Sequence, residues 1–305
     1  MKHTNTPILL IVYNRPEIVQ KLLKALNKIK PIDVFVFCDG PKTKADRLLV
    51  TKTRKLFKEL PWACNVTRKF QKNNLGCQKG VSSAISWFFE NVPQGIILED
   101  DCIPNKSFFN FTASLLKKYK NDTRISMISG SNLGFKNCSN DSYFYSKYSM
   151  VWGWATWKNE WKAYDKHYNY KTEKLFSKNN TQICRRLGIN NKFISNVKKA
   201  HQGKLDSWAY LWSYFNLIEN RLSVIPKYNL IKNIGFGNEA THTKIKTSLS
   251  ELKKENMSKD IKHPVFLVSN YKFDLYVEKT DKFLYILFDA IRLQIKKYLK
   301  KINSF

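Results

Sequence analysis

The sequence predicts a mainly parallel, doubly wound α/β sheet, and three observations support this fold class. Short apolar runs that read as strands alternate with longer segments of helical periodicity over the first hundred residues. Polar residues with Gly or Pro separate these segments, as turns require. The chain has 305 residues, 43% of them hydrophobic, which is enough for one large core. Such an alternation is typical of parallel strands joined by crossover helices.

Each element follows from a local pattern. The first strand is a continuous apolar run at 8–13, and Pro16 suits the start of a helix whose apolar spacing extends to residue 29. By the same reasoning the following elements are strands at 33–38, 64–70 and 95–98, helices at 44–59, 76–89 and 107–119, and a strand at 125–128. Ligands of such sheets gather where the strands end at their carboxyl side.

The most informative segment is residues 96–104, where an apolar strand ends in three consecutive acids. Glu99, Asp100 and Asp101 stand where carboxylates are costly to desolvate. A Mg²⁺ or Mn²⁺ ion would bind such oxygen ligands and bridge them to phosphate oxygens. The segment therefore predicts a metal and diphosphate site, and the alternative is a simple acidic turn after a strand.

Composition limits the class of partner and the compartment. The formal net charge is +29, from 53 basic and 24 acidic residues, which indicates nucleic acid, a phospholipid surface or a phosphorylated substrate as partner. The six cysteines form no CxxC pair, so reduced thiols in a cytosolic protein are favoured over disulfides. No apolar segment is long enough for a spanning helix or a signal-peptide core, which predicts a soluble or peripheral protein.

The lysine-rich tail at 246–305 ends in a pattern of a basic amphipathic helix. Its apolar residues recur at helical spacing at Leu284, Leu287, Phe288, Ile291, Ile295, Tyr298 and Ile302. Basic residues lie off that stripe, with no acid among them, which is typical of helices that lie on anionic lipid. The alternative is a helix that packs on the core and exposes its lysines to water.

Four short motifs follow one another along the chain. The first strand leads into Tyr13-Asn14-Arg15-Pro16, and the second ends in Cys38-Asp39-Gly40. The acidic triplet comes next, and Leu205-Asp206-Ser207-Trp208 lies further on. In this order they resemble the GT-A fold glycosyltransferases that use nucleotide-sugar donors, and most of all bacterial relatives of the N-acetylglucosaminyltransferase I family, with the triplet at the family's EDD motif and Asp206 in the segment that resembles the one with its catalytic Asp. The resemblance covers roughly residues 7 to 243. It implies a nucleotide-sugar-binding half at 1–130, an acceptor-binding half at 131–245 and the basic tail at 246–305.

The resemblance also implies a reaction and roles for particular residues. The reaction is an inverting, metal-dependent transfer from a UDP-sugar to a hydroxyl of a cell-surface glycan or lipid-linked acceptor, such as lipopolysaccharide or capsule. Asp206 would remove the proton from that hydroxyl, and Asp101 with His242 would bind Mn²⁺ or Mg²⁺. The donor would be bound by Arg15, Asp39, Lys79, Glu99 and Asp100.

Each of these roles has a structural alternative. Lys79 follows Gly76 at a helix start, where free backbone N–H groups would help it to bind donor phosphate, or it is a solvated lysine. Asp206 is either the catalytic base or the N-cap of a helix at 207–217. Aromatic side chains that would stack on a sugar, or alternatively pack in the core, are Trp152, Trp154 and Trp208.

Two other classes of function compete with the glycosyltransferase. A nucleic-acid-binding protein would explain the charge, but the chain has no recognisable nucleic-acid motif, so no nucleic-acid partner is expected. A sugar nucleotidyltransferase would share the sheet, but it would need a Gly-rich loop where this chain has Tyr13-Asn14-Arg15-Pro16. The sequence therefore predicts a cytoplasmic transferase that is peripheral on the inner face of the plasma membrane.

Overall fold

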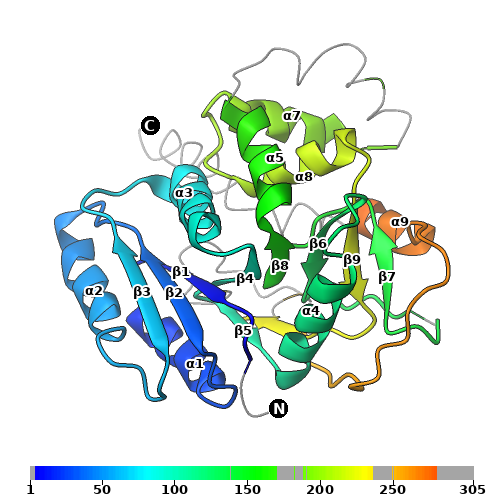
Figure 1. The fold of residues 1–305 in the computed structure, drawn as a ribbon. Helices are drawn as coiled ribbons and strands as arrows, with labels where there is room; N and C mark the ends of the chain where they lie inside the picture. Colours follow the sequence, from blue (N-terminus) through cyan, green and yellow to red (C-terminus); the bar gives the residue numbers. More distant parts are fainter. Residues whose placement is uncertain are drawn as a thin grey trace.

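The computed structural model describes residues 4–137, 139–169, 182, 188–189, 191–235, 249 and 251–279. These residues contain an eight-stranded mixed sheet in the order β3-β2-β1-β4-β8-β6-β9-β7 (Figure 1). Its strands are β1 (Ile8–Val12), β2 (Asp33–Cys38), β3 (Asn65–Phe70), β4 (Gln94–Glu99), β6 (Ile125–Ser129), β7 (Tyr143–Ser146), β8 (Trp154–Trp157) and β9 (Leu222–Pro226). The short strands β5 (Cys102–Pro104) and β10 (Ile231–Asn233) pair antiparallel in a second sheet.

The pairing of the strands confirms the predicted fold class. β1 pairs in parallel with β2 and β4, and β2 pairs in parallel with β3. β8 enters antiparallel between β4 and β6, and β9 then continues in parallel with β6. The result is a Rossmann-like, doubly wound mixed sheet, consistent with the GT-A-like class that the sequence predicted.

Helices cover the sheet and follow the predicted series in the first half of the chain. They are α1 (Pro16–Leu26), α2 (Lys44–Lys55), α3 (Gly76–Asn91), α4 (Lys106–Lys118), α5 (Lys158–Asn169), α7 (Asn191–His201), α8 (Ala209–Ile218) and α9 (Tyr271–Lys279). In the view of Figure 1, α3, α5, α7 and α8 lie in the upper half, and α1 and α4 lie in the lower half. Pro16 occupies the first turn of α1, where its missing N–H costs nothing.

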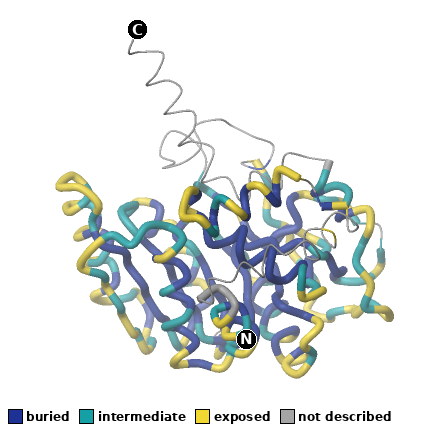
Figure 2. The backbone as a smooth tube through the Cα atoms, turned by 90° about the horizontal axis from the view of Figure 1, so that it is seen from above, coloured by how far each residue is buried: buried dark blue, intermediate teal, exposed yellow. Residues whose placement is uncertain are grey.

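The core is built from the parallel strands and from a group of tryptophans. Every residue of β1 is buried, as expected of a strand with a neighbour on each side and helices on both faces. Figure 2 shows buried backbone through the centre of the molecule and exposed backbone at its rim. A second part of the core is aromatic: Trp154 stacks on Trp208 with 5.6 Å between ring centroids and also contacts Trp161 and Trp212.

The second half of the chain was only partly predictable. The aromatic stretch at 143–161 forms β7, β8 and the start of α5, which the sequence did not resolve into elements. The predicted basic helix at 284–302 lies outside the described residues. In the part of the chain that is described, no helix is both long and apolar enough to cross a membrane. The predicted division at residues 130 and 245 stays a prediction.

Asp274 makes the stability of the fold depend on pH. Its carboxylate lies buried in α9 and accepts a hydrogen bond from Ser146 Oγ at 2.6 Å. Burial raises the pKa of Asp274 to about 6, although the Ser146 hydroxyl and the charge of Lys147 oppose the shift. Between about pH 4 and 6 the folded chain therefore holds a proton that the unfolded chain has released.

We expect the free energy of unfolding to fall as the pH rises through this window, by an amount on the order of 3 kcal/mol. Asp274→Asn should make this loss smaller, because its amide oxygen can still accept from Ser146 but carries no titrating proton. The part of the loss that comes from buried Asp100, whose pKa is also raised to about 6, should remain in the variant. Urea unfolding at pH 4, 5, 6 and 7 measures the slope. The interpretation fails if wild type and variant lose stability in parallel over that range.

Candidate functional site at the carboxyl edge of the sheet

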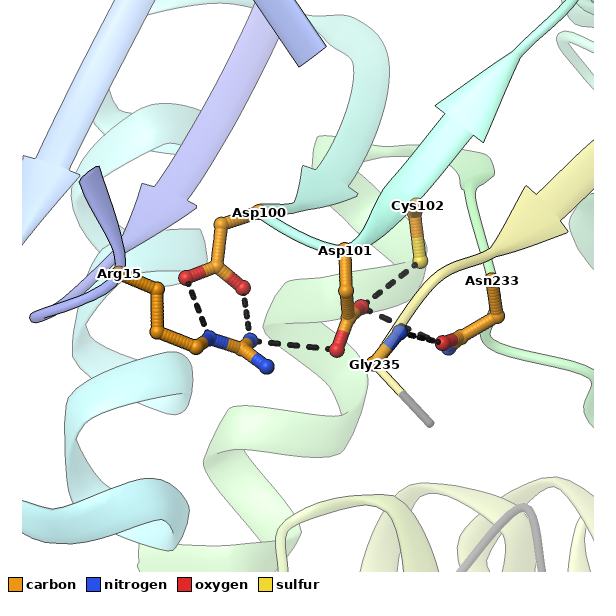
Figure 3. A network of polar contacts seen from close by, with 6 residues as sticks. All are labelled: Arg15, Asp100, Asp101, Cys102, Asn233 and Gly235. Carbon is orange, nitrogen blue, oxygen red and sulfur yellow. Dashed lines mark hydrogen bonds and ion pairs between the residues drawn. The ribbon is translucent and has the colours of Figure 1, made fainter. Parts of the chain in front are cut away.

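The carboxyl ends of β1 and β4 bring one arginine and two aspartates together (Figure 3). Arg15 lies between β1 and α1, and its guanidinium binds both carboxylate oxygens of Asp100 through Nε and one terminal nitrogen. The same terminal nitrogen lies 3.1 Å from Oδ2 of Asp101. Residues that the sequence predicted at the ends of two strands thus form one ion-paired cluster.

The electrostatics of this cluster depend on burial and on Arg15. Asp100 is only 3% exposed, and burial together with the charge of Asp101 raises its pKa to about 6, against the opposing effect of Arg15. For Arg15, burial favours the neutral form, but the two carboxylates outweigh it and raise the pKa of the guanidinium. The guanidinium therefore stays charged and compensates two acids that would otherwise repel each other.

Asp101 is held by residues that the sequence did not indicate. It lies in the turn between β4 and β5, and its backbone carbonyl accepts from the N–H of Ile234 at 2.9 Å. The side-chain amide of Asn233 donates to Asp101 Oδ1 at 3.5 Å, while its oxygen accepts from the N–H of Gly235 at 2.7 Å. Gly235 lies directly against the carboxylate, because a Cβ there would lie 2.3 Å from Asp101 Oδ2. The one signal in the sequence is a pair of glycines close together, Gly235 and Gly237, just after Asn233.

Asp39 organises the loops at the end of β2. Its carboxylate accepts from the N–H of Gly40 at 2.8 Å, of Leu75 at 2.9 Å and of Gly76 at 3.2 Å, and from the side-chain amide of Asn74 at 2.9 Å. Burial raises the pKa of Asp39, these donors lower it, and the charge of nearby Asp206 adds to the rise. The predicted donor-binding Asp therefore already has protein partners on both oxygens.

Asp206 reaches the same place from a distant part of the chain. Its carboxylate accepts from the N–H of Cys77 at 2.9 Å and of Gln78 at 2.6 Å, both in the first turn of α3. The helix that follows Asp206, α8, begins at Ala209 and has no side-chain cap. The predicted alternative role, a cap of a helix at 207–217, is therefore wrong: Asp206 caps α3 instead.

Lys79 lies in the first turn of the same helix. The backbone N–H groups at the start of α3 are not free for a donor phosphate, because the carboxylates of Asp39 and Asp206 accept from them. The side chain of Lys79 is exposed in the first turn of the helix. A phosphate could use these N–H groups only by displacing a carboxylate, so the donor role of Lys79 stays a prediction.

The remaining predicted residues have different surroundings. Glu99 is half-buried at the end of β4, in register with Ile11 of β1. His242 lies outside the described residues, so its metal role stays a prediction. The predicted sugar-stacking residues are all buried, at 7%, 1% and 3% exposure for Trp152, Trp154 and Trp208. Stacking on a sugar needs an open ring face, whereas the stacked pair of Trp154 and Trp208 packs in the core.

The residues present fit a divalent cation that is shared with a substrate. Within the described ranges no group of three or more His, Cys, Asp or Glu side chains could hold a metal ion alone. Mg²⁺ is commonly bound by one or two carboxylates and completes its coordination with substrate phosphates and water. Asp101 could supply such a carboxylate, since it is half-buried, accepts a hydrogen bond from Asn233 and lies close against Gly235. The donor set suits oxygen-liganded Mg²⁺ or Mn²⁺ rather than a closed protein cage.

Comparison with known proteins identifies no family. No family model and no curated protein matches the chain. Similar solved structures include a glucose-1-phosphate thymidylyltransferase from Bacillus anthracis, at 7% identity and a TM-score of 0.32, covering 52% of this chain and 74% of that one. A 4-diphosphocytidyl-2C-methyl-D-erythritol synthase from Anaerococcus prevotii has 8% identity and a TM-score of 0.31, covering 55% and 79%. A UDP-glucose pyrophosphorylase complexed with UDP-glucose has 7% identity and a TM-score of 0.29, covering 53% and 80%.

Likeness to solved structures at these TM-scores carries no argument about activity. The class that the fold and the site define is therefore an α/β protein with an acidic, arginine-paired site at the carboxyl edge of its sheet. The resemblance to the N-acetylglucosaminyltransferase I family stays a prediction from the motifs.

Proposed function

We propose that the chain is a glycosyltransferase that moves a sugar from a nucleotide-sugar donor, with UDP as its nucleotide, to an acceptor hydroxyl. The observation that supports this most is the cluster of Arg15, Asp100 and Asp101 where the parallel strands β1 and β4 end. Ligands of doubly wound sheets bind at this edge. A carboxylate that is held there by a second layer of contacts suits a metal bound to diphosphate.

In this proposal each residue has a distinct task. Asp101 would hold a divalent cation, which would supply Lewis-acid stabilisation of the departing diphosphate. Arg15 pairs with both carboxylates and fixes their orientation. Asp39 holds the loop at 73–76 against the end of β2, which shapes the space beside the cluster.

Asp206 would accept the proton of the acceptor hydroxyl as the hydroxyl attacks the anomeric carbon. Its side chain is exposed, although each oxygen already accepts one backbone N–H. A carboxylate has about four lone-pair positions, so both oxygens can accept a further hydrogen bond. The two N–H contacts fix the carboxylate without consuming its capacity as a base.

A turnover assay tests the function and separates it from the alternative of a sugar nucleotidyltransferase. The wild-type chain is incubated with Mn²⁺ and a panel of UDP-sugars, with simple glycosides and lipid-linked sugars as acceptors. Release of UDP together with a glycosylated acceptor supports the proposal. Release of pyrophosphate from a nucleoside triphosphate and a sugar 1-phosphate would instead establish a nucleotidyltransferase.

Asp206→Asn is expected to lower kcat by a factor of about 10² to 10⁴ and to leave the affinity for UDP unchanged, since general-base catalysis contributes this much. The amide oxygen of Asn can still accept from the start of α3, so the fold should persist. Asp141→Asn, a change of a half-buried carboxylate that accepts from Ser139, serves as the control. Unchanged turnover with reduced thermal stability would show that Asp206 is only a cap of α3.

A further inference from the structure

A cluster of exposed apolar side chains lies at the outer edge of the sheet, far along the chain from the cluster of acids. Val265, Phe266, Val268 and Tyr271 are 88%, 77%, 68% and 72% exposed, and we call them the strap surface. The other large hydrophobic side chains that the described residues expose are scattered over the sequence, at Ile32, Leu48, Phe70 and Tyr228. Grouped apolar exposure of this kind marks an interaction site, whereas single exposed residues do not.

The backbone beneath the strap surface is fixed at two places. Before it, the N–H of Ser142 donates to the carbonyl of Lys262 at 2.9 Å, and the N–H of Lys262 donates to Ser142 Oγ at 2.9 Å. Between Val268 and Tyr271, Ser269 forms a parallel bridge with Tyr145 of β7, and the N–H of Asn270 donates to the Tyr145 carbonyl at 2.7 Å. The exposed side chains therefore belong to an ordered surface rather than to a frayed end.

The segment then enters the core directly. The side chain of Asn270 caps α9 by accepting from the N–H of Phe273 at 3.0 Å, and Phe273 is fully buried. Figure 1 shows α9, in orange, beside β7 at the far edge of the sheet. The fold thus buries Phe273 completely, whereas Phe266, a residue of the same type seven positions earlier, is 77% exposed.

The charges around the strap surface indicate an anionic partner. Between residues 261 and 273 the sequence contains Lys262, His263 and Lys272 but no acid, and all three side chains are exposed. A second copy of the chain would bring another formal charge of +29 to the contact, which opposes self-association. An anionic lipid surface attracts lysines and also offers an apolar layer for valine and phenylalanine. Tyr271 is of the type that settles at the level of the headgroups.

We propose that the strap surface docks the protein on an anionic lipid bilayer, with Val265, Phe266 and Val268 inserted between the headgroups. The flanking Lys262 and Lys272 would bind the acidic headgroups. This inference goes beyond the proposed function, since it rests on contacts and exposure at β7 and α9 and uses no residue of the acidic cluster.

The test compares the binding of full-length variants to sedimenting vesicles of phosphatidylcholine, with and without phosphatidylglycerol. Val265→Ser/Phe266→Ser/Val268→Ser should lower the partition coefficient onto the anionic vesicles by about tenfold or more, because it removes the inserted apolar area. Leu48→Ser is the matched control, since Leu48 is 62% exposed on α2, away from the strap surface. It should bind like wild type. Circular dichroism should be unchanged in both variants, because the altered side chains are in water.

Two further measurements complete the test: the salt dependence of vesicle binding and the oligomeric state of the protein. Raising the ionic strength should weaken the binding of wild type to anionic vesicles, as electrostatic attraction requires. The proposal is overturned if wild type does not bind these vesicles, or if the triple variant binds as well as wild type. It is also overturned if sedimentation shows that wild type is a dimer and that the triple substitution makes it a monomer, because the surface would then join two copies of the chain.

Discussion

Replacing Arg15 with Met should destabilise the fold by about 3–5 kcal/mol, which is among the largest effects that we expect from one substitution. The guanidinium is the cation that binds the buried Asp100 and the adjacent Asp101. Without it, a carboxylate with 3% exposure would face a second acid with no compensating charge. Chemical denaturation of wild type and variant measures the loss.

A second variant shows whether the loss comes from the unpaired charge. Arg15→Met/Asp100→Asn removes both partners of the closest ion pair and should recover more than half of the lost stability, because no uncompensated charge then remains on Asp100. Equal stability of the single and double variants would contradict this account. It would show that Arg15 acts through its packing and not through the pairing of charges.

Gly235→Ala should abolish the binding of UDP with Mn²⁺ and leave the sheet folded. A Cβ at this position would lie 2.3 Å from Asp101 Oδ2 and 3.1 Å from Asn233 Oδ1, so the carboxylate must move. A displacement of about 1 Å in a preorganised site is enough to disrupt it. Isothermal titration calorimetry measures the affinity, and circular dichroism reports the fold.

Gly80→Ala provides a matched control for this prediction. Gly80 lies within α3, and a Cβ there would meet its nearest neighbour, Asp39 Oδ2, at 3.5 Å, which is ordinary contact. Its substitution should therefore preserve the binding of UDP and slightly favour the helix. If Gly235→Ala binds UDP like Gly80→Ala, the tight contact with Asp101 has no functional role.

The sequence was sufficient for the first half of the fold because the signals there are local. Continuous apolar runs such as 8–13 and 33–38 identify buried parallel strands without reference to the rest of the chain. The same local patterns predicted that Arg15, Asp39 and Asp101 lie at the ends of neighbouring strands. Parallel pairing of β1 with β2 and β4 then brings those ends to a single edge.

Local sequence patterns could not predict the contacts that hold Asp101 in place. It depends on the pairing of β5 with β10, two strands of three residues that are separated by more than a hundred residues. Strands this short have no periodicity to detect. Asn233 and Gly235 therefore gain their roles only from tertiary structure, in which Ile234 also binds the backbone of Asp101.

For Asp206, and separately for the tryptophans, the sequence pattern is compatible with two different structures. An acid before an apolar helical run suggests a local cap, yet Asp206 caps α3, more than a hundred residues earlier in the chain. Likewise, a tryptophan-rich segment suits either a sugar site or a core. Trp154 lies in the core because β8 occupies an interior position of the sheet, where both faces are covered.

The central claim is that Asp101 holds a cation at a nucleotide-diphosphate site. The most direct test is calorimetric titration of UDP, with and without Mn²⁺, into wild type and Asp101→Asn, a variant of equal size that leaves Arg15 paired with Asp100. We expect wild type to bind UDP only with Mn²⁺ and the variant to bind it at least about a hundredfold more weakly. The account is contradicted if wild type binds no UDP in the presence of Mn²⁺, or if Asp101→Asn binds it equally well.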